Sequence, residues 1–589
     1  MATAERPALR EQTLPANDLT RRWAWSGLAI VLAAGLGLRL WGVRQGLPYA
    51  YNADEADHFV PHAIEMFVHG TLNPKYFANP PAFTYVLHGL FAVWYGGASG
   101  AVHAYRHDPA ALYTLARVAA AVLGTIALWL LYLTGARLWG RAVGLLAAAI
   151  EAVAFLPVFY AHLALNDAPT LAPATLSLLG TAGALRKGRV RDYLLAGIGL
   201  GLACATKYTA GIVLVPLLAA IAMRCLDGGA KAARRAIGGL AVAGLLALVA
   251  FLIANPYALL DYKSFHAELV HQSTLSGESQ GKLGAPKEGG LVYYLWSFTW
   301  GLGWAPSIAA LGGAICVWRR ERALGWLLVP AALLFLAFMG TEGRYFGRWL
   351  MPIFPIVCLL AAFFVAQVLS WAVREQGAGA RRAALAALLV AGVLVQGLVY
   401  SIHSGIVLSR VDTRNLTRSW MLEHIPAGAK VVAEPVEPEE WAREVRPGTS
   451  TAANPLRWQL YPALFRRVTT AGTIAPAFIR PAVGLENYET TLYPALIDFY
   501  EREGYCWVIV GSTEYGRAFA DPKAVPHAIA YYRKLAREGE LVFRSSPYGK
   551  GESPVAFNFD WSFDYYPMTY VRPGPAMKIF RLRGGRCAA

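Results

Sequence analysis

Apolar segments long enough to cross a bilayer recur along the chain from Trp23 to His403, and no other feature constrains the fold as strongly. A transmembrane helix needs roughly 20 apolar residues, and in lipid only helices and closed barrels satisfy every backbone polar group. About eleven transmembrane helices are therefore predicted. They cover residues 23–43, 110–133, 142–162, 168–185, 192–206, 208–224, 236–254, 291–318, 323–340, 346–370 and 382–403.

The rest of the chain, residues 411–589, has the pattern of a soluble domain. With 56% hydrophobic and 16% charged residues overall, the chain is too apolar to be water-soluble throughout. After His403, however, the long apolar segments stop and short strand and helix patterns begin. A helix and a strand are predicted in 412–435, further strands in 505–512, 539–546 and 576–583, and an amphipathic helix in 528–538. We expect a small α/β or α+β domain.

The net charge of +16 comes mainly from Arg and Lys in short loops between the apolar segments. This pattern reports membrane orientation and argues against a nucleic-acid-binding surface. The basic clusters are Arg21/Arg22, Arg137/Arg141, Arg186/Lys187/Arg189/Arg191, Arg224 to Arg235, Arg319/Arg320/Arg322 and Arg374/Arg381/Arg382. If the eleven or so segments alternate, all the clusters lie on the cytoplasmic side with the tail 1–22, and the C-terminal domain lies outside.

The segment from Ala82 to Gly96 is apolar but too short for a comfortable crossing. It follows the Pro80-Pro81 break, and counting it as a full span would move the later basic clusters outside. An in-plane or re-entrant helix is therefore predicted. The six cysteines include no CxxC pair, so we expect neither a disulfide framework nor a zinc site.

This topology gathers charged residues of both signs on the outer face, partly in a long first loop, residues 44–81. The carboxylates are Asp54, Glu55, Asp57 and Asp167, and the cations are Arg117, Lys207, Arg344 and Arg348. Cations near the lipid surface suit an anionic lipid phosphate, which arginine can bind through two hydrogen bonds. A site at this lipid-water boundary is predicted.

The acidic pair Asp54-Glu55 also has a structural interpretation. Asn52 can cap a helix with Glu55 at the third helical position, as in a capping box, and both acids suit the positive end of a helix dipole. Asp54 and His58 are four residues apart, a spacing that allows a divalent metal ion but more often gives an ordinary hydrogen bond.

Asp167 and Lys207 have structural alternatives too. Asp167 can simply cap the helix that it begins, with Pro169 in the first turn. A lysine at membrane depth is costly and so is a functional candidate, although its side chain can instead extend to the interface. The same ambiguity applies to Arg344.

These residues together resemble the membrane-embedded GT-C glycosyltransferases, in particular the family of dolichyl-phosphate-mannose protein mannosyltransferases and bacterial aminoarabinose lipid A transferases. The resemblance covers residues 23–403. It rests on Asp54-Glu55, Gly70 followed by Pro80-Pro81 and Tyr85, Arg117, Asn166-Asp167, Lys207, and Arg344-Tyr345 before Pro352. Asn79 departs from the pattern, because some aminoarabinose transferases carry a basic residue there, and this argues against a lipid A acceptor.

The resemblance implies an inverting transfer of a sugar from a polyprenyl-phosphate donor to a glycan, lipid or protein acceptor, on the extracytoplasmic face of the inner or plasma membrane. Asp54 is then the general base, and Glu55 and Asp167 orient the acceptor or the sugar. Lys207 and Arg344, with Arg117, bind the donor phosphate. The candidate substrate contacts are His58, Tyr85, Tyr345 and Arg348. No metal ion or other cofactor is assigned, although some GT-C enzymes use a divalent metal.

Two other classes of protein are weighed against this one. A secondary transporter would also have a membrane-depth charge such as Lys207, but it predicts charges near the bilayer midplane and an inverted repeat, and we find no such repeat in the sequence. A scaffold protein leaves the outer charges unexplained. The aromatic run 557–570 could stack on sugar rings or pack in an ordinary core.

Overall fold

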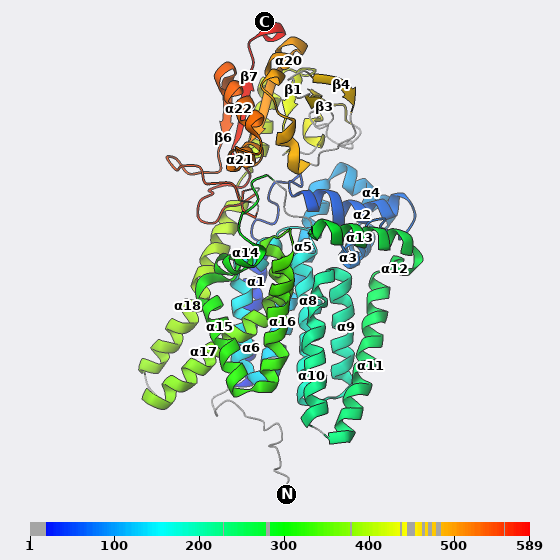
Figure 1. Ribbon diagram of the computed structural model, residues 1–589, viewed down its shortest axis with the longest axis vertical. Coiled ribbons are helices and arrows are strands. Elements are labelled where there is room, and N and C mark those ends of the chain that lie inside the picture. Colours follow the sequence, from blue (N-terminus) through cyan, green and yellow to red (C-terminus); the bar gives the residue numbers. More distant parts are fainter. Residues whose placement is uncertain are drawn as a thin grey trace.

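The structure, a computed structural model, has a helical bundle at one end and a domain built on a β-sheet at the other (Figure 1). The residues described are 19–227, 229–277, 283–376, 380–435, 439–444, 454–461, 466–468, 474–478, 485–558, 560–562 and 564–588. The predicted fold class, a polytopic helical membrane protein with a C-terminal domain of strands and helices, is confirmed.

Most helices of the bundle are long. They are α1 (Arg21–Leu40), α5 (Pro109–Trp139), α6 (Arg141–Val153), α8 (Asp167–Arg186), α9 (Val190–Thr206), α10 (Leu214–Asp227), α11 (Gly229–Ala254), α14 (Gly290–Phe298), α15 (Trp304–Arg320), α16 (Arg322–Thr341), α17 (Phe354–Gln376) and α18 (Ala380–Leu408). Among the described residues, 8 helical stretches are long and apolar enough to cross a membrane. The predicted segments 142–162, 168–185 and 192–206 are helical but fall outside that group. For α8 the reason is its place in the bundle, since it is buried along its length by α5, α9 and α10 and needs little lipid-facing surface.

Shorter helices lie where the bundle meets the C-terminal domain (Figure 1). They are α2 (Val60–Val68), α3 (Ala82–Trp94), α4 (Ala98–His107), α12 (Tyr257–Leu260) and α13 (Tyr262–Gly277). The helix predicted to be in-plane or re-entrant is α3, which begins directly after Pro81 and has only 13 residues. Short irregular helices η1 (Glu55–Phe59), η2 (Tyr208–Val213), η3 (Thr299–Gly303), η4 (Gly347–Ile353) and α7 (Phe155–Tyr160) complete this layer.

The basic clusters include Arg224 to Arg235, where α10 and α11 meet at the opposite end of the bundle from the C-terminal domain (Figure 1). Arginines of four of these clusters make side-chain contacts. Arg141 donates to the carbonyl of Leu19 at 2.9 Å, Arg137 pairs with Asp192 at 3.1 Å, Arg186 approaches Glu321 at 4.0 Å, Arg224 donates to the carbonyl of Leu185 at 3.2 Å, and Arg320 donates to Gln367 at 2.6 Å. The side chains of Arg374, Arg381 and Arg382 lie outside the described residues.

The C-terminal domain is a mixed sheet of strand order β2-β1-β5-β7-β6. Its strands are β1 (Lys430–Ala433), β2 (Gln459–Leu460), β5 (Tyr505–Gly511), β6 (Glu540–Ser545) and β7 (Met577–Arg581), and β3 (Arg466–Val468) pairs separately with β4 (Ile474–Phe478). Helices α20 (Ala495–Glu503), α21 (Ser512–Ala520), α22 (Pro526–Glu538) and α19 (Thr413–His424), with η5 (Glu439–Ala442), η8 (Leu485–Thr491) and η9 (Gly585–Cys587), complete it.

The alternating direction of the side chains along β5 explains why both faces of this sheet are covered. Successive side chains of a strand point to opposite faces. Val508 and Val510 therefore pack in one cluster, with α20 and α22, while Ile509 packs in a second cluster with Met421 of α19.

One prediction about the cysteines is wrong, because Cys506 and Cys587 form a disulfide. They are 81 residues apart in sequence, but η9 returns to the start of β5 and brings their Cα atoms to 5.3 Å. Spacing alone does not reveal such a pair. The other cysteines, Cys204, Cys225, Cys316 and Cys358, are free.

Candidate active site

A cavity of about 730 Å³ lies at the junction, between the first outer loop, the start of α8, the Lys207 turn, α13 and the segment that leads into α17. Its charged and polar lining includes Asp54, His58, Tyr76, Asn79, Asp167, Lys207, Glu268, His271, Gln272, Glu342, Arg344 and Arg348. Five residues predicted from the outer-face charges thus share one cavity: Asp54, Asp167, Lys207, Arg344 and Arg348.

Arg348 joins the two carboxylates of this cavity. Its Nη2 atom lies 2.5 Å from Oδ2 of Asp54, and its Nε atom lies 3.9 Å from Oδ2 of Asp167. Asp54 comes directly before η1, whereas Arg348 is the second residue of η4. The guanidinium group therefore connects the loop of residues 44–81 to the start of α8.

Asp167 and Lys207 form the second ion pair, through a short contact between Oδ1 and Nζ. Asp167 is the first residue of α8, directly after the N-cap residue Asn166, and its carboxylate is turned toward the lysine. Lys207 lies in an extended turn between α9 and η2, and the Asn166 side chain donates to the carbonyl of Thr206 at 2.7 Å to hold this turn. The lysine is buried against the aspartate rather than extended into water.

Glu55 and Arg117 lie in the packed interior, and neither lines the cavity. Two hydrogen bonds of 2.7 Å join them, and Arg117 also donates to the carbonyls of Val43 and Gln45. Glu55 accepts a further bond of 2.8 Å from the Ala164 backbone. This pair joins the loop of residues 44–81 to α5. We assign it a structural role, in place of the predicted roles of Glu55 in orienting the acceptor or sugar and of Arg117 in binding the donor phosphate.

The capping interpretation of Asn52 holds in part. Its side chain accepts a 3.3 Å hydrogen bond from the Glu55 backbone, but the Glu55 carboxylate turns inward and does not complete a capping box. His58 approaches Asp54 at 3.7 Å and stacks on Tyr76, with ring centroids 4.7 Å apart.

Two predicted substrate contacts, Tyr85 and Tyr345, lie outside the cavity lining. The Tyr85 hydroxyl donates to the carbonyl of Leu72 at 2.8 Å, and the Tyr345 hydroxyl donates to the carbonyls of Pro286 and Glu288. In the part of the chain that the structure describes, no group of three or more His, Cys, Asp or Glu side chains is arranged to hold a metal ion.

Sequence reasoning missed two contributors to the site. Glu268 of α13 accepts hydrogen bonds from the backbone N–H groups of Phe77 and Ala78, which ties the first outer loop over the cavity. Asp560, from the C-terminal domain, accepts a 3.1 Å bond from the Gly347 backbone beside Arg348. Burial raises the pKa of Asp560 to about 7, although the bond from Gly347 works against this shift. For Asp560, the only signal in the sequence was its position inside the aromatic run 557–570.

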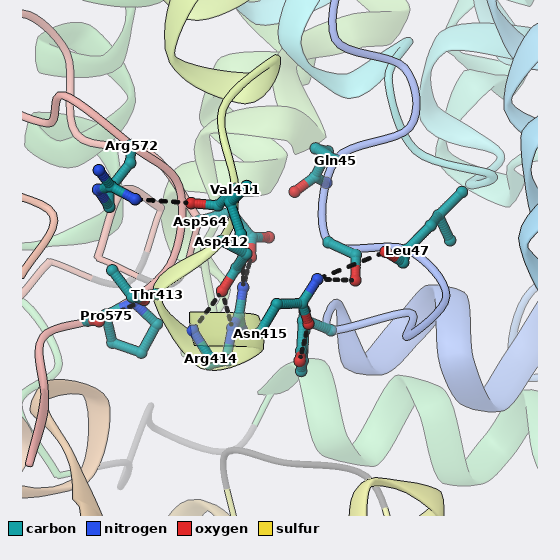
Figure 2. Close-up of polar contacts among 12 residues, drawn as sticks. Gln45, Leu47, Val411, Asp412, Thr413, Arg414, Asn415, Asp564, Arg572 and Pro575 are labelled. Atoms are coloured by element: carbon teal, nitrogen blue, oxygen red, sulfur yellow. Dashed lines mark hydrogen bonds and ion pairs between the residues drawn. The ribbon is translucent and has the colours of Figure 1, made fainter. Parts of the chain in front are cut away.

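A second contact between the two parts of the molecule centres on Arg414, near the start of α19 (Figure 2). Its guanidinium group binds Asp412 at 2.8 and 2.9 Å and Asp564 at 2.6 Å, and it lies 3.7 Å from the ring centre of Tyr51. Asn415 accepts from the Tyr51 hydroxyl and donates to the carbonyl of Gly46. The C-terminal domain is thus anchored to the loop that carries Asp54.

The fold defines a multi-pass helical membrane protein, and parts of the sequence are similar to glycosyltransferases. The sequence model of the dolichyl-phosphate-mannose-protein mannosyltransferase family matches residues 113–256, a stretch that includes Asp167 and Lys207. The lipid A galacturonosyltransferase RgtD of Rhizobium johnstonii is 26% identical over 352 residues, which are 58% of this chain and 65% of RgtD. The chain therefore matches somewhat less than two thirds of that relative's length.

Among solved structures, the oligosaccharyltransferase of Archaeoglobus fulgidus has a TM-score of 0.49 and 12% identity, over 90% of this chain and 73% of its own. ArnT from Cupriavidus metallidurans, bound to undecaprenyl phosphate, has a TM-score of 0.47 and 15% identity, over 95% of this chain and 98% of its own.

Proposed function

We propose that the chain is an inverting glycosyltransferase that moves a sugar from a polyprenyl-phosphate donor to an acceptor on the outer face of the membrane. The observation that carries the proposal is the cavity in which Asp54 faces Arg348 while Asp167 faces Lys207. This cavity brings together carboxylates that can accept a proton and cations that can bind a phosphate. It lies at the junction of the bundle with the C-terminal domain. The matches to glycosyltransferases support the same reaction class.

In this reaction the acceptor hydroxyl attacks the anomeric carbon of the sugar from the face opposite the phosphate. Asp54 accepts the hydroxyl proton as the new carbon–oxygen bond forms. The bond between the anomeric carbon and the phosphate oxygen breaks, and its electron pair stays on that oxygen. One displacement inverts the anomeric centre and releases polyprenyl phosphate, so no covalent intermediate with the protein is needed.

Lys207 and Arg348 bind the donor phosphate and stabilise the negative charge that grows as the bond breaks. Both already lie beside a carboxylate, which holds each cation in the cavity before the phosphate binds. Arg344 lines the same cavity and contributes to this anion site. Asp167 orients the sugar, and His58 contacts the substrate beside Asp54.

Two independent features support the proposed orientation of the protein. Basic clusters gather at the end of the bundle away from the C-terminal domain, which is the pattern of a cytoplasmic face. The C-terminal domain also carries the Cys506–Cys587 disulfide, which persists in oxidising compartments. Both features support an inner or plasma membrane location with the cavity and residues 411–589 on the extracytoplasmic side.

Transfer from radiolabelled polyprenyl-phosphate sugars, assayed in membranes with glycan, lipid and protein acceptors, tests the function. The wild-type protein should transfer label, and Asp54→Asn should not. Asp57→Asn is the matched control, because this acid lies in the same loop but does not line the cavity. Equal transfer by wild type and Asp54→Asn would remove Asp54 as the base, and movement of free sugar across the membrane would favour a transporter.

The orientation has its own test. In intact cells, a maleimide that cannot cross the membrane should label Cys506 and Cys587 only after an equally impermeant reductant is added from outside. Labelling that requires permeabilised cells would place the C-terminal domain in the cytoplasm.

A further inference from the structure

Asp560 belongs to the C-terminal domain, but one oxygen of its carboxylate accepts hydrogen bonds from the membrane bundle. Its Oδ2 atom accepts from the backbone N–H of Gly347 at 3.1 Å and, through a short contact, from the hydroxyl of Tyr293 in α14. The side chain is buried, with 9% of the residue exposed. A carboxylate so deeply placed has to be held by its partners, and equally it restrains them.

The partner Gly347 directly precedes Arg348 and begins η4. The backbone here is tightly enclosed, because a Cβ atom on Gly347 would lie 2.7 Å from the Trp300 ring and 3.3 Å from Oδ2 of Asp560. Tyr160 fills the space nearby, interacting with both Arg348 and Asp560, and its ring centre is 5.8 Å from the Arg348 guanidinium carbon. The direction in which Arg348 leaves the backbone is therefore fixed partly by the outer domain.

We propose that Asp560 is a positioning residue that holds Arg348 in line with Asp54 and Asp167, so that the outer domain completes the anion site of the cavity. This inference rests on the proposed function in one respect, since Arg348 is taken as a ligand of the donor phosphate. It gives the C-terminal domain a role in donor binding, separate from any choice of acceptor.

Other contacts also hold the C-terminal domain against the bundle, so the effect of Asp560 on Arg348 can be measured separately from its effect on the position of the domain. Asp564 lies four residues further along the same segment and binds Arg414 rather than η4. Trp561 packs against Trp296 and Trp300, with ring centroids 5.3 and 4.9 Å apart. Removing the Asp560 carboxylate leaves these contacts in place.

The test measures binding of undecaprenyl phosphate to the purified full-length protein in nanodiscs. Asp560→Ala and Arg348→Ala should each weaken binding by about tenfold, and the double variant should be no weaker than Arg348→Ala alone, because the two residues act through one contact. Asp560→Asn, which keeps an acceptor oxygen, should remain within about twofold of wild type. Asp564→Ala is the matched control, with a lower unfolding temperature but unchanged binding.

If Asp560→Ala does not fold, Tyr293→Phe replaces it, since it removes one donor to the same carboxylate, and about threefold weaker binding is expected. Wild-type binding from Asp560→Ala, or additive losses in the double variant, would overturn the inference while leaving the proposed function intact.

A wild-type protein that does not bind undecaprenyl phosphate would instead count against the proposed function. The position of Arg348 is then judged by its rate of modification with phenylglyoxal, followed by peptide mass spectrometry. That rate should rise in Asp560→Ala and not in Asp564→Ala, and equal rates in wild type and Asp560→Ala would reject the inference.

Discussion

Asp54 and Glu55 are neighbours in the sequence, yet their carboxylates lie in two different environments. The Asp54 side chain is 35% exposed and shares Arg348 with Asp167 in the cavity. The Glu55 side chain is fully buried and has its oxygens occupied by Arg117 and the Ala164 backbone. A pair open to a cavity can exchange partners with a substrate, whereas a closed and fully bonded pair can only hold the structure. Position along a loop does not by itself identify a reactive acid.

Asp54→Asn should give the largest change in activity. Loss of a general base typically slows a reaction by about 100-fold to 10,000-fold. Because Asp54 is partly exposed, the unfolding temperature should change little. Transfer rates and thermal unfolding of the same purified samples check this, and a large loss of stability would mean that the open pair is structural after all.

Glu55→Gln should do the opposite and mainly reduce stability. Breaking a buried ion pair from one side costs about 3–5 kcal/mol, because the other charge is left without a partner. The double variant Glu55→Met/Arg117→Met should recover much of that loss, which thermal unfolding in detergent can measure. Slow transfer by a double variant that is as stable as wild type would show that the closed pair also takes part in catalysis.

The Lys207–Asp167 pair is both buried and open to the cavity, so changes to it should affect both transfer activity and stability. Lys207→Met is expected to slow transfer by about 100-fold, through lost stabilisation of the leaving phosphate, and to lower stability. Adding Asp167→Asn should restore stability but not transfer. Recovery of transfer in the double variant would contradict a phosphate-binding role for Lys207.

The smallest effect concerns Asp560, which is buried like Glu55 but bonded by neutral donors. Burial raises its pKa from 3.8 to about 7, so between these values the folded protein holds a proton that the unfolded chain releases. The free energy of unfolding should therefore fall as pH rises toward 7, by at most about 1.4 kcal/mol per pH unit. Asp560→Asn should flatten this dependence. Unfolding temperatures at about pH 5 and about pH 7.5 check the prediction, and an unchanged slope would contradict it.

Local patterns predicted the elements of the fold well. Hydropathy located the long helices, and alternation located β5, β6 and β7, because both patterns arise from which face of an element is buried. The eleven predicted segments are all helical, but three fall outside the group that can span by length and hydropathy. A helix such as α8, enclosed by protein, has no need of a lipid-facing surface.

The cavity was partly predictable, because the alternation of the predicted helices places charges of both signs on one face of the membrane. That argument brought Asp167, Lys207 and Arg348 together. It could not separate Asp54 from Glu55, since η1 turns as a π-helix rather than an α-helix and side-chain direction there depends on what packs beneath.

Contacts over long sequence separations were beyond this reasoning. Asp560 and Gly347 are 213 residues apart, and Cys506 and Cys587 are 81 residues apart. Neither pair has a local pattern. The disulfide depends on how the C-terminal domain folds, and the contact of Asp560 with Gly347 depends on how that domain rests on the bundle.

The tight fit of Gly347 against Trp300 has a practical consequence. Alanine at this position would clash, because its methyl group would lie 2.7 Å from the Trp300 ring and force the tryptophan or the backbone to shift. Such a substitution changes no charged group and adds only one carbon atom. We expect Gly347→Ala to give a temperature-sensitive protein. A modest rise in growth temperature should weaken the contact between the helical bundle and the C-terminal domain and reduce activity in living cells.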